Sequence, residues 1–318
     1  MISISPELRR ATAAGLAVVA GLALAACGSS SGSSGSGSGS SNPLASAAPK
    51  NSVVVGSANF PEDELLAQIY STALAAKGIK VTNKFNIGAR EAYYPELQSG
   101  AVTILPEYNG ALLSTSVDKT STASTTAEVD AALQAKLPST LEILNPSAAQ
   151  DKDSVTVTQA FAKAHHLTSI SDLSPIAKTM VIGGPPEFKT RNDGLVGLKN
   201  NYGLHFKSFD PLDESGPITL KALTSGKVQA ADVFTTTPQL ITDKLVALTD
   251  PKFNFAAQNV LPLVYKPGVN STIVDTLNAI SAKLTTEALL DMDKAIIVDH
   301  ADYTTVASGW LAAEGLPN

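Results

Sequence analysis

The chain has 318 residues, of which 44% are hydrophobic and 16% are charged. That apolar content predicts folded cores and excludes a disordered chain. The formal net charge is −6 and no run of basic residues occurs, so neither nucleic acid nor an anionic lipid surface is expected as an electrostatic partner.

Residues 1–26 predict a cleaved export signal. Arg9 and Arg10 precede an apolar run over residues 11–26, which is too short to span a bilayer. The run ends in Leu-Ala-Ala directly before Cys27, the pattern of a bacterial lipoprotein signal in which the cysteine becomes lipidated. An ordinary secretory signal is the alternative.

A flexible linker is expected between the signal and the folded body. Residues 28–41 contain only Gly and Ser, so residues 27–50 predict a tether behind a lipidated Cys27. Cys27 is the only cysteine, so no disulfide can form within the chain. Together these features predict a protein of the cell envelope, lipid-anchored to the outer face of the cytoplasmic membrane.

From about residue 51 onward, short apolar runs alternate with helical patterns, which predicts an α/β fold with largely parallel strands. Strands are expected at residues 52–56, 79–82, 101–105, 179–182, 206–209, 228–233 and 260–264. Helices are expected at residues 61–77, 91–99, 271–284, 287–298 and 302–315.

The folded body carries no recognisable catalytic motif. It contains no Gly-x-Ser-x-Gly elbow, no Walker loop and no Gly-x-Gly-x-x-Gly after a strand. His165, His166, His205 and His300 do not stand at metal-ligand spacing. No enzyme activity, metal or cofactor is therefore expected, although a lipid-anchored enzyme whose carboxylates meet only in the fold stays open.

Several short segments occur along the body in the order typical of one protein family. They read VVGSANF at 54–60, LPEYNG at 105–110, GPPEF at 184–188, RNDG at 191–194, YGLHF at 202–206, ADVFTT at 231–236 and KLTT at 283–286. In this order they resemble the ProX/OpuC (OpuAC) family, the substrate-binding proteins of ABC importers for osmoprotectants such as glycine betaine.

The resemblance implies a two-lobe α/β fold of the periplasmic-binding-protein type (type II), with the ligand cleft between the lobes. It also implies that the C-terminal segment returns to the first lobe. We therefore expect lobe I at residues 51–150 plus 259–318 and lobe II at 151–258, with crossings near Gln150 and Gln258.

The resemblance also implies site residues. Aromatic faces attract a quaternary ammonium, and Arg suits a carboxylate. Tyr108 matches a cage aromatic of the family, Arg191 its carboxylate-binding Arg, and Phe234 the place of a cage Tyr. The alternatives are a packed Tyr, a surface cation and a core Phe.

The chain departs from the family pattern at three places. Ala58 stands where many relatives have Lys, and Asp153 and Gln258 stand where the family has cage tyrosines. A carboxylate can pair directly with a ligand cation and favours N–H donors. The ligand is therefore expected to be a small cationic or zwitterionic solute, not necessarily glycine betaine.

Further residues are candidates by position. Asn59 lies in the first strand–helix loop, Asn109 follows Tyr108 in its motif, and Thr235 follows a strand. Arg90 and Tyr93 open a helix whose N-terminus could meet a ligand, or they serve to cap and pack that helix.

Taken together, the features predict a monomeric ligand-binding lipoprotein that delivers a glycine betaine-, choline- or carnitine-like solute to a separate permease and ATPase. The alternatives are a receptor or scaffold of the same fold, which binds another amine or amino-acid derivative, and the lipid-anchored enzyme.

Overall fold

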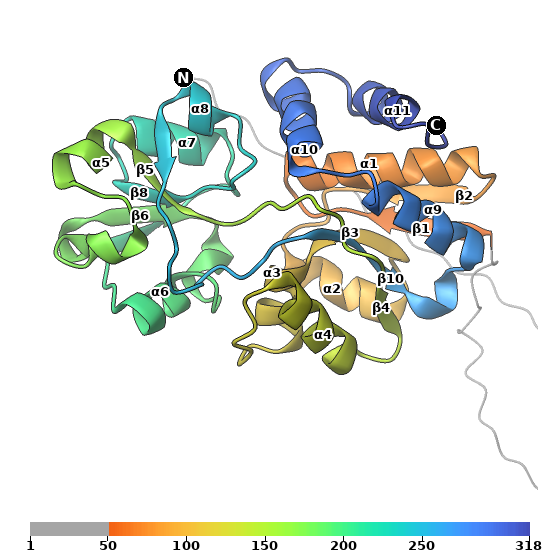
Figure 1. The fold of residues 1–318 in the computed structure, drawn as a ribbon, viewed down its shortest axis with the longest axis horizontal. Coiled ribbons are helices and arrows are strands. Elements are labelled where there is room, and N and C mark those ends of the chain that lie inside the picture. The colour runs from red at the N-terminus through yellow and green to blue at the C-terminus, as the bar shows by residue number, and fades with distance from the viewer. Residues whose placement is uncertain (1–50) are drawn as a thin grey trace, which may run out of the picture. The chain divides into compact units, whose positions relative to one another are not determined.

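A five-stranded mixed sheet forms the centre of lobe I in this computed structural model, which describes residues 51–318 (Figure 1). β1 runs parallel to β2 and β3, whereas β10 runs antiparallel to β3 and β4. The strand order across the sheet is β2 (Lys80–Lys84), β1 (Ser52–Gly56), β3 (Ile104–Tyr108), β10 (Val260–Tyr265) and β4 (Leu141–Ile143).

A second five-stranded sheet forms the centre of lobe II. Here β6 runs parallel to β7 and β8, and β5 runs antiparallel to β8 and β9. The strand order is β7 (Ser208–Pro211), β6 (Val181–Gly184), β8 (Ala230–Asp232), β5 (Val155–Thr158) and β9 (Leu245–Ala247).

Helix α1 is the central helix of lobe I. Pro61 opens it, and Glu62, Asp63 and Glu64 follow in the first turn, where the helix dipole favours acidic groups. It packs against β1 and β3 on one side and against α9 and α11 on the other. The helices of lobe I are α1 (Pro61–Ala76), α2 (Arg90–Ser99), α3 (Asn109–Leu112), η1 (Leu113–Val117), α4 (Thr126–Lys136), η5 (Lys266–Gly268), α9 (Ser271–Ser281), α10 (Thr286–Asp293), η6 (Lys294–Val298) and α11 (Tyr303–Ala313).

Lobe II has its own apolar core, which includes Val155, Ile182, Phe188 and Leu198. Its helices are short, and side chains of Thr158 and Ser169 cap two of them. They are α5 (Gln159–His165), η2 (Ile170–Leu173), η3 (Ala177–Thr179), η4 (Pro186–Lys189), α6 (Leu195–Tyr202), α7 (Pro217–Thr224) and α8 (Gln239–Thr242).

Two extended segments join the lobes, one between β4 and β5 and one between β9 and β10 (Figure 1). They touch through an isolated antiparallel bridge between Gln150 and Asn259, and the Asp151 amide donates to the Gln258 carbonyl. Paired crossing strands of this kind form a hinge around which lobes can rotate.

The expected α/β fold with two lobes is confirmed, and the C-terminal segment does return to the first sheet through β10. The expectation of largely parallel strands needs a correction, because each sheet carries antiparallel strands contributed by the crossing segments. Among the described residues, no helix combines the length and hydropathy needed to cross a membrane. The expected signal, Cys27 and linker lie outside the described residues.

Candidate functional site

A narrow cavity lies between the lobes, beside the crossing segments, and we call it the aromatic compartment. Its free space of about 40 Å³ has room for a few water molecules only. Loops at strand ends, helices α2 and α3 and both crossing segments contribute to the lining. The lining residues are Ala58, Phe60, Arg90, Tyr93, Tyr108, Ala111, Asp151, Asp153, Arg191, Glu214, Phe234 and Gln258.

Three aromatic rings from both lobes meet in this compartment. Phe60, at the start of α1, lies 5.1 Å from Phe234 of lobe II in an edge-to-face arrangement, measured between ring centroids. The centroid of Tyr108, at the end of β3, lies 5.9 Å from that of Phe60. Such rings present electron-rich faces to a cation, and here one wall of the cage belongs to each lobe.

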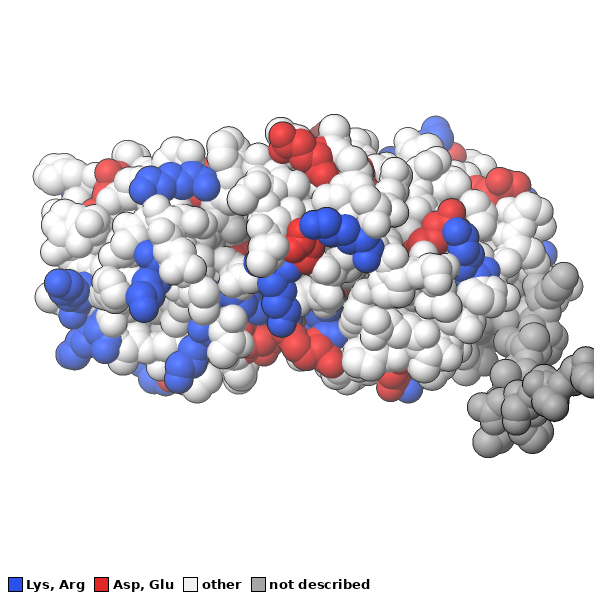
Figure 2. All heavy atoms as spheres, turned by 90° about the horizontal axis from the view of Figure 1, so that it is seen from below, with Lys and Arg blue, Asp and Glu red and all other residues white. Residues whose placement is uncertain are grey.

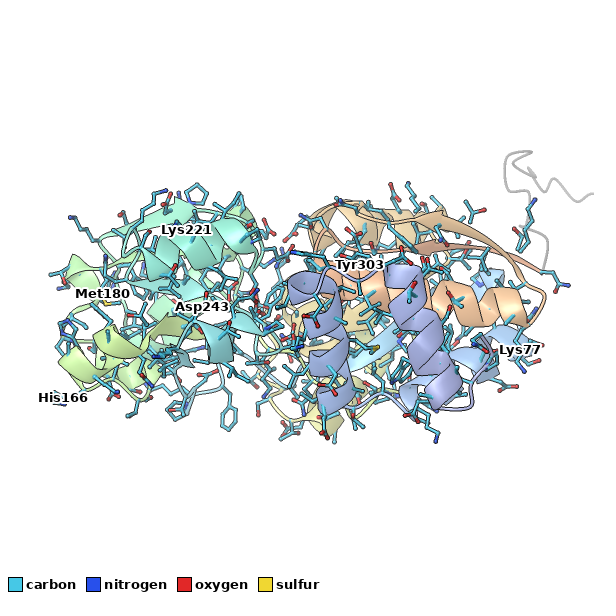
Figure 3. The ribbon with its side chains drawn as sticks, turned by 90° about the horizontal axis from the view of Figure 1, so that it is seen from above. Lys77, His166, Met180, Lys221, Asp243 and Tyr303 are labelled. Atoms are coloured by element: carbon cyan, nitrogen blue, oxygen red, sulfur yellow. The ribbon has the colours of Figure 1, made fainter. Side chains whose placement is uncertain are left out.

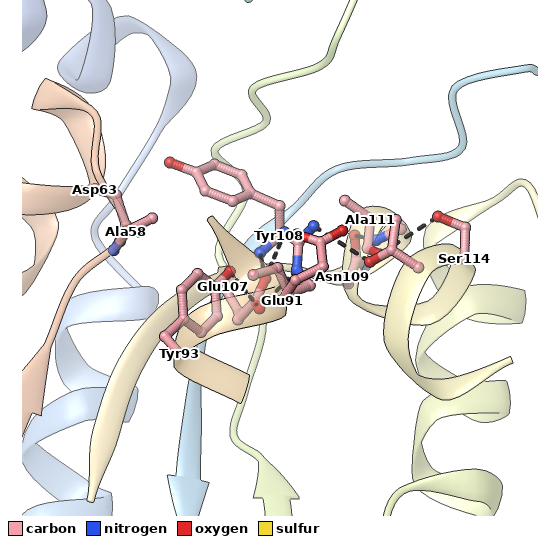
Figure 4. A network of polar contacts seen from close by, with 12 residues as sticks. Ala58, Asp63, Glu91, Tyr93, Glu107, Tyr108, Asn109, Ala111 and Ser114 are labelled. Atoms are coloured by element: carbon pink, nitrogen blue, oxygen red, sulfur yellow. Dashed lines mark hydrogen bonds and ion pairs between the residues drawn. The ribbon is translucent and has the colours of Figure 1, made fainter. Parts of the chain in front are cut away.

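A buried ion pair fixes the floor of the compartment. Arg90 donates two hydrogen bonds to Glu107, of 2.9 and 3.0 Å. The Tyr93 hydroxyl donates a third, of 2.8 Å (Figure 4). The Tyr108 amide also donates to Glu107, so this carboxylate orients the backbone that carries the cage ring. Neighbouring Glu107 raises the pKa of Arg90 despite the opposing effect of burial. We conclude that the Arg90 guanidinium has Glu107 as its partner within the protein.

The Tyr108 hydroxyl points toward the side of the compartment where Ala58 and Asp63 lie (Figure 4). It donates to Glu62 Oε1 in the first turn of α1. This bond fixes the ring in its orientation. The nearby β1–α1 loop is held by Asp63, whose carboxylate accepts from the Ala58 amide. The acidic first turn of α1 therefore positions two parts of the compartment wall.

A second ion pair closes the compartment between the lobes. Arg191 of lobe II donates two hydrogen bonds to Glu91 of lobe I, of 3.1 and 2.9 Å. Acidic and basic side chains lie together at the middle of the face in Figure 2. Adjacent contacts also cross the cleft, since the Ser114 hydroxyl donates to Asp193 and the Asn192 side chain donates to the Lys119 carbonyl.

The remaining charges of the compartment are carboxyl groups. Burial, reinforced by neighbouring Asp193, raises the pKa of Asp153 to about 6. Burial likewise raises the pKa of Glu214 to about 7. It raises that of Asp151, which accepts from the Thr236 amide and also lies near Glu62. The compartment is therefore acidic, since both of its Arg side chains already have carboxylate partners.

Five of the residues expected from the sequence lie together in this compartment: Tyr108, Asp153, Arg191, Phe234 and Gln258. Gln258 also holds the backbone of α3, since its Oε1 accepts a hydrogen bond from the Ala111 amide. Ala58, at the place of the family's Lys, lines the same cavity.

Three expected residues do not line it. Asn59 is exposed, because the β1–α1 loop turns its side chain to the surface. Asn109 is fully buried, and its amide bonds Asp130 and the Asn259 backbone, so it joins the two ends of the lobe. The Thr235 hydroxyl donates to Asp151 and accepts from the Lys152 amide at the crossing segment, and Thr235 does not line the cavity.

Sequence reasoning missed Phe60, Asp151 and Glu214 as lining residues. Phe60 lies within the family-like segment at 54–60. Its position directly before Pro61, which opens a helix, was the signal that could have placed it in the first strand–helix loop. Glu214 and Asp151 lie in irregular segments where no local pattern distinguishes them from surface acids. Within residues 51–318, no group of three or more His, Cys, Asp or Glu side chains could hold a metal ion.

Comparisons with known proteins agree with this geometry. The chain is 24% identical over 286 residues to the "Ergothioneine transport permease/ergothioneine binding protein EgtU" of Helicobacter pylori, covering 86% of this chain and 51% of that protein. The chain thus spans about half the length of that relative. It is 26% identical over 239 residues to the "Glycine-betaine-binding protein" of Pseudomonas aeruginosa, with 70% of this chain and 74% of that one covered.

A solved structure described as a glycine betaine/carnitine/choline ABC transporter shares the fold. It has a TM-score of 0.64 and 19% identity, and the match covers 83% of this chain and 98% of that one. Residues 51–313 match the family described as the substrate binding domain of an ABC-type glycine betaine transport system. Because this match spans nearly all of the described residues, the chain belongs to that family of ABC-transporter substrate-binding domains.

Proposed function

We propose that this protein binds a small organic cation or zwitterion of the choline, carnitine or glycine betaine type between its lobes and delivers it to an ABC permease. The observation that carries the proposal is the aromatic compartment, where Phe60, Tyr108 and Phe234 meet beside carboxyl groups that, within residues 51–318, form no ion pair with an Arg. A quaternary ammonium has no N–H donor, so ring faces and nearby negative charge are the groups that attract it.

Closure of the lobes is the proposed mechanism. The ring contact between Phe60 and Phe234 leaves too little space for such a ligand, so entry requires the lobes to part at the crossing segments. A ligand held by rings of both lobes then stabilises the closed form by its higher affinity for that form. We place the lobe boundaries at Gln150 and Gln258, and the support is that the two crossing segments pair at these residues, Gln150 with Asn259 and the Asp151 amide with the Gln258 carbonyl. No covalent step is needed, and we propose that the protein is not an enzyme.

The position of Arg191 bears on the choice between cation and zwitterion. Its Nε and Nη2 already bind Glu91, so a ligand carboxylate reaches only the remaining N–H groups and competes with Glu91 for the guanidinium charge. A ligand without a carboxylate meets no such competition. We therefore propose that choline-like cations bind at least as well as glycine betaine.

We further propose a monomer that is lipid-anchored through Cys27 at the outer face of the cytoplasmic membrane, with the permease and ATPase as separate chains. The Cys27 pattern and the linker after it support the anchor. Metabolic labelling with a fatty acid should mark the wild-type protein and leave the Cys27→Ala variant unlabelled.

Calorimetric titration tests the proposed ligand class. Choline, carnitine, glycine betaine and ergothioneine would each be titrated into the purified protein, with thermal unfolding as a second readout. A ligand at 100 times its Kd should stabilise the folded state by about 2.7 kcal/mol. Binding of at least one quaternary ammonium is expected, and failure of all four would overturn the proposed ligand class.

A further inference from the structure

A second hollow adjoins the aromatic compartment on the side of α7 and α10, and we call it the acidic chamber. Its volume is about 510 Å³, within the range of small-molecule pockets. Phe60, Glu214 and Phe234 line both spaces, so the two adjoin at these residues. Figure 3 views this side from above, with Lys221 and Asp243 on lobe II and Tyr303 on lobe I.

The chamber has apolar walls. Leu220 of α7 faces it from lobe II, and Ile296, Ile297 and Tyr303 face it from lobe I. Such walls suit the hydrocarbon part of a ligand.

Several buried acceptors of the chamber have no donor within residues 51–318. Four buried side-chain oxygens of its lining receive no hydrogen bond from the described residues: Glu62 Oε2, Glu214 Oε2, Gln239 Oε1 and Asp293 Oδ1. The side chains of Lys221 and His300 also line it but are exposed. The Thr236 hydroxyl interacts with both Glu62 and Asp293, but no buried basic side chain in the described lining of the chamber lies beside these carboxyl groups. Buried acceptors normally have donors, and a bound cation with N–H groups would supply the ones that are missing.

Two of these acceptors belong to a carboxyl pair from different elements of lobe I. Glu62, in the first turn of α1, is 3% exposed, and Asp293, at the end of α10, is 1% exposed. The two carboxyl groups interact with each other, and burial raises the pKa of both, that of Asp293 to about 7. A cation placed here would replace the shared proton and satisfy both oxygens.

We propose that the acidic chamber is a subsite for a second, N–H-bearing cationic group of the ligand, whose first group occupies the aromatic compartment. The ligand class is then an extended organic cation. A quaternary nitrogen, or another nitrogen held by the protein's aromatic rings, lies at one end, and a protonated amine or guanidinium lies at the other. This inference rests on the proposed function for the aromatic compartment. It further specifies that the ligand is long enough to reach the acidic chamber and carries a second positive charge there.

A matched pair of probes tests the subsite. (3-Aminopropyl)trimethylammonium and butyltrimethylammonium have the same length and the same quaternary head, and they differ only in a terminal ammonium against a methyl group. Both would be titrated into the purified protein by calorimetry beside choline. We expect the amine to bind about tenfold more tightly than its alkyl counterpart.

Variants assign that preference to the chamber. Asp293→Asn keeps the shape and removes one carboxylate, so the amine should lose most of its advantage over the alkyl probe. Ile297→Trp narrows the chamber and should weaken both long probes relative to choline. Asp275→Asn changes an exposed acid on α9 and serves as the matched control, with the wild-type preference retained.

The outcomes separate the two proposals. If neither probe binds, and choline, carnitine, glycine betaine and ergothioneine fail as well, the proposed function is wrong. If the probes bind and the amine gains nothing, or keeps its gain in Asp293→Asn, the subsite is wrong and the carboxyl pair is a structural contact that shares a proton. Circular dichroism and the unfolding temperature of each variant show whether it is folded.

Discussion

The two hollows of the cleft hold buried charges in opposite ways. In the aromatic compartment each Arg has a bidentate carboxylate partner, Arg90 with Glu107 and Arg191 with Glu91. In the acidic chamber, carboxyl oxygens of Glu62 and Asp293 lack donors. The difference separates groups whose partners are built into the fold from groups that have a proton or a ligand as their partner.

The largest expected effect comes from breaking the internal pair. Arg90→Met leaves Glu107 buried and without its counter-charge, which should cost roughly 3–5 kcal/mol of unfolding free energy. Urea denaturation measures this loss. Lys84→Met, in the more exposed pair with Glu96, is the matched control and should cost at most about 1 kcal/mol.

A double variant sharpens the test. Arg90→Met combined with Glu107→Gln removes both charges and should recover part of the lost stability. An Arg90→Met protein as stable as wild type would contradict the assignment of Arg90 to the internal pair.

The next effect concerns the aromatic cage. Phe234→Ala removes the wall contributed by lobe II and should weaken choline binding roughly tenfold, because a ring face contributes about 1–2 kcal/mol to a desolvated cation. Calorimetry measures the affinity. Phe161→Ala, on α5 of the same lobe, removes a ring that does not line the cleft and should leave the affinity unchanged. Equal losses of choline affinity in both variants would show that Phe234→Ala acts by disturbing the fold of lobe II and not by removing a wall of the cage.

A smaller effect is expected at the pair that crosses the cleft. Glu91→Gln weakens the competition for Arg191, so the affinity for glycine betaine relative to choline should rise by a few-fold, because an ion pair whose Glu91 side chain is largely exposed contributes at most about 1 kcal/mol. The ratio of the two dissociation constants is the readout. Glu96→Gln on the same helix is the control, and an unchanged ratio in Glu91→Gln would show that Arg191 does not meet the ligand carboxylate.

The smallest effect is a pH dependence of opposite sign for stability and binding. Burial raises the pKa of Asp153 to about 6 and those of Glu214 and Asp293 to about 7. Between pH 5 and 8 the unfolded chain therefore binds fewer protons than the folded protein, so stability falls as the pH rises. We expect the unfolding temperature without ligand to drop by a few degrees between pH 5.5 and 8.

Cation affinity should change in the other direction over the same range, because the carboxyl groups gain negative charge as they lose their protons. Asp293→Asn should flatten both profiles. Stability that rises with pH in this range would contradict the burial of protonated carboxyl groups in the cleft.

Local sequence predicted much of the fold and part of the site. The family-like segments located Tyr108 and Phe234, which lie at or just beyond the ends of β3 and β8, the edge of a sheet where ligand loops gather. The role of Asn109 was out of reach, because its partner Asn259 lies 150 residues away. The partner of Arg191 was equally hidden, 100 residues earlier in the chain.

Antiparallel strands were missed for a related reason. β5 and β10 are formed by the segments that enter from the other lobe, and an apolar run such as β10 shows no sign of its direction. The carboxyl pair of Glu62 and Asp293 likewise depends on the packing of α10 near the start of α1. Sequence periodicity describes one element at a time, whereas these features depend on how elements meet.

A crystal structure with choline bound tests the central claim most directly. Our account predicts the trimethylammonium group among Phe60, Tyr108 and Phe234, with its nitrogen within about 6 Å of the ring centroids. Choline bound elsewhere, for instance with its ammonium against Glu62 and Asp293 and the three rings still in mutual contact, would contradict it.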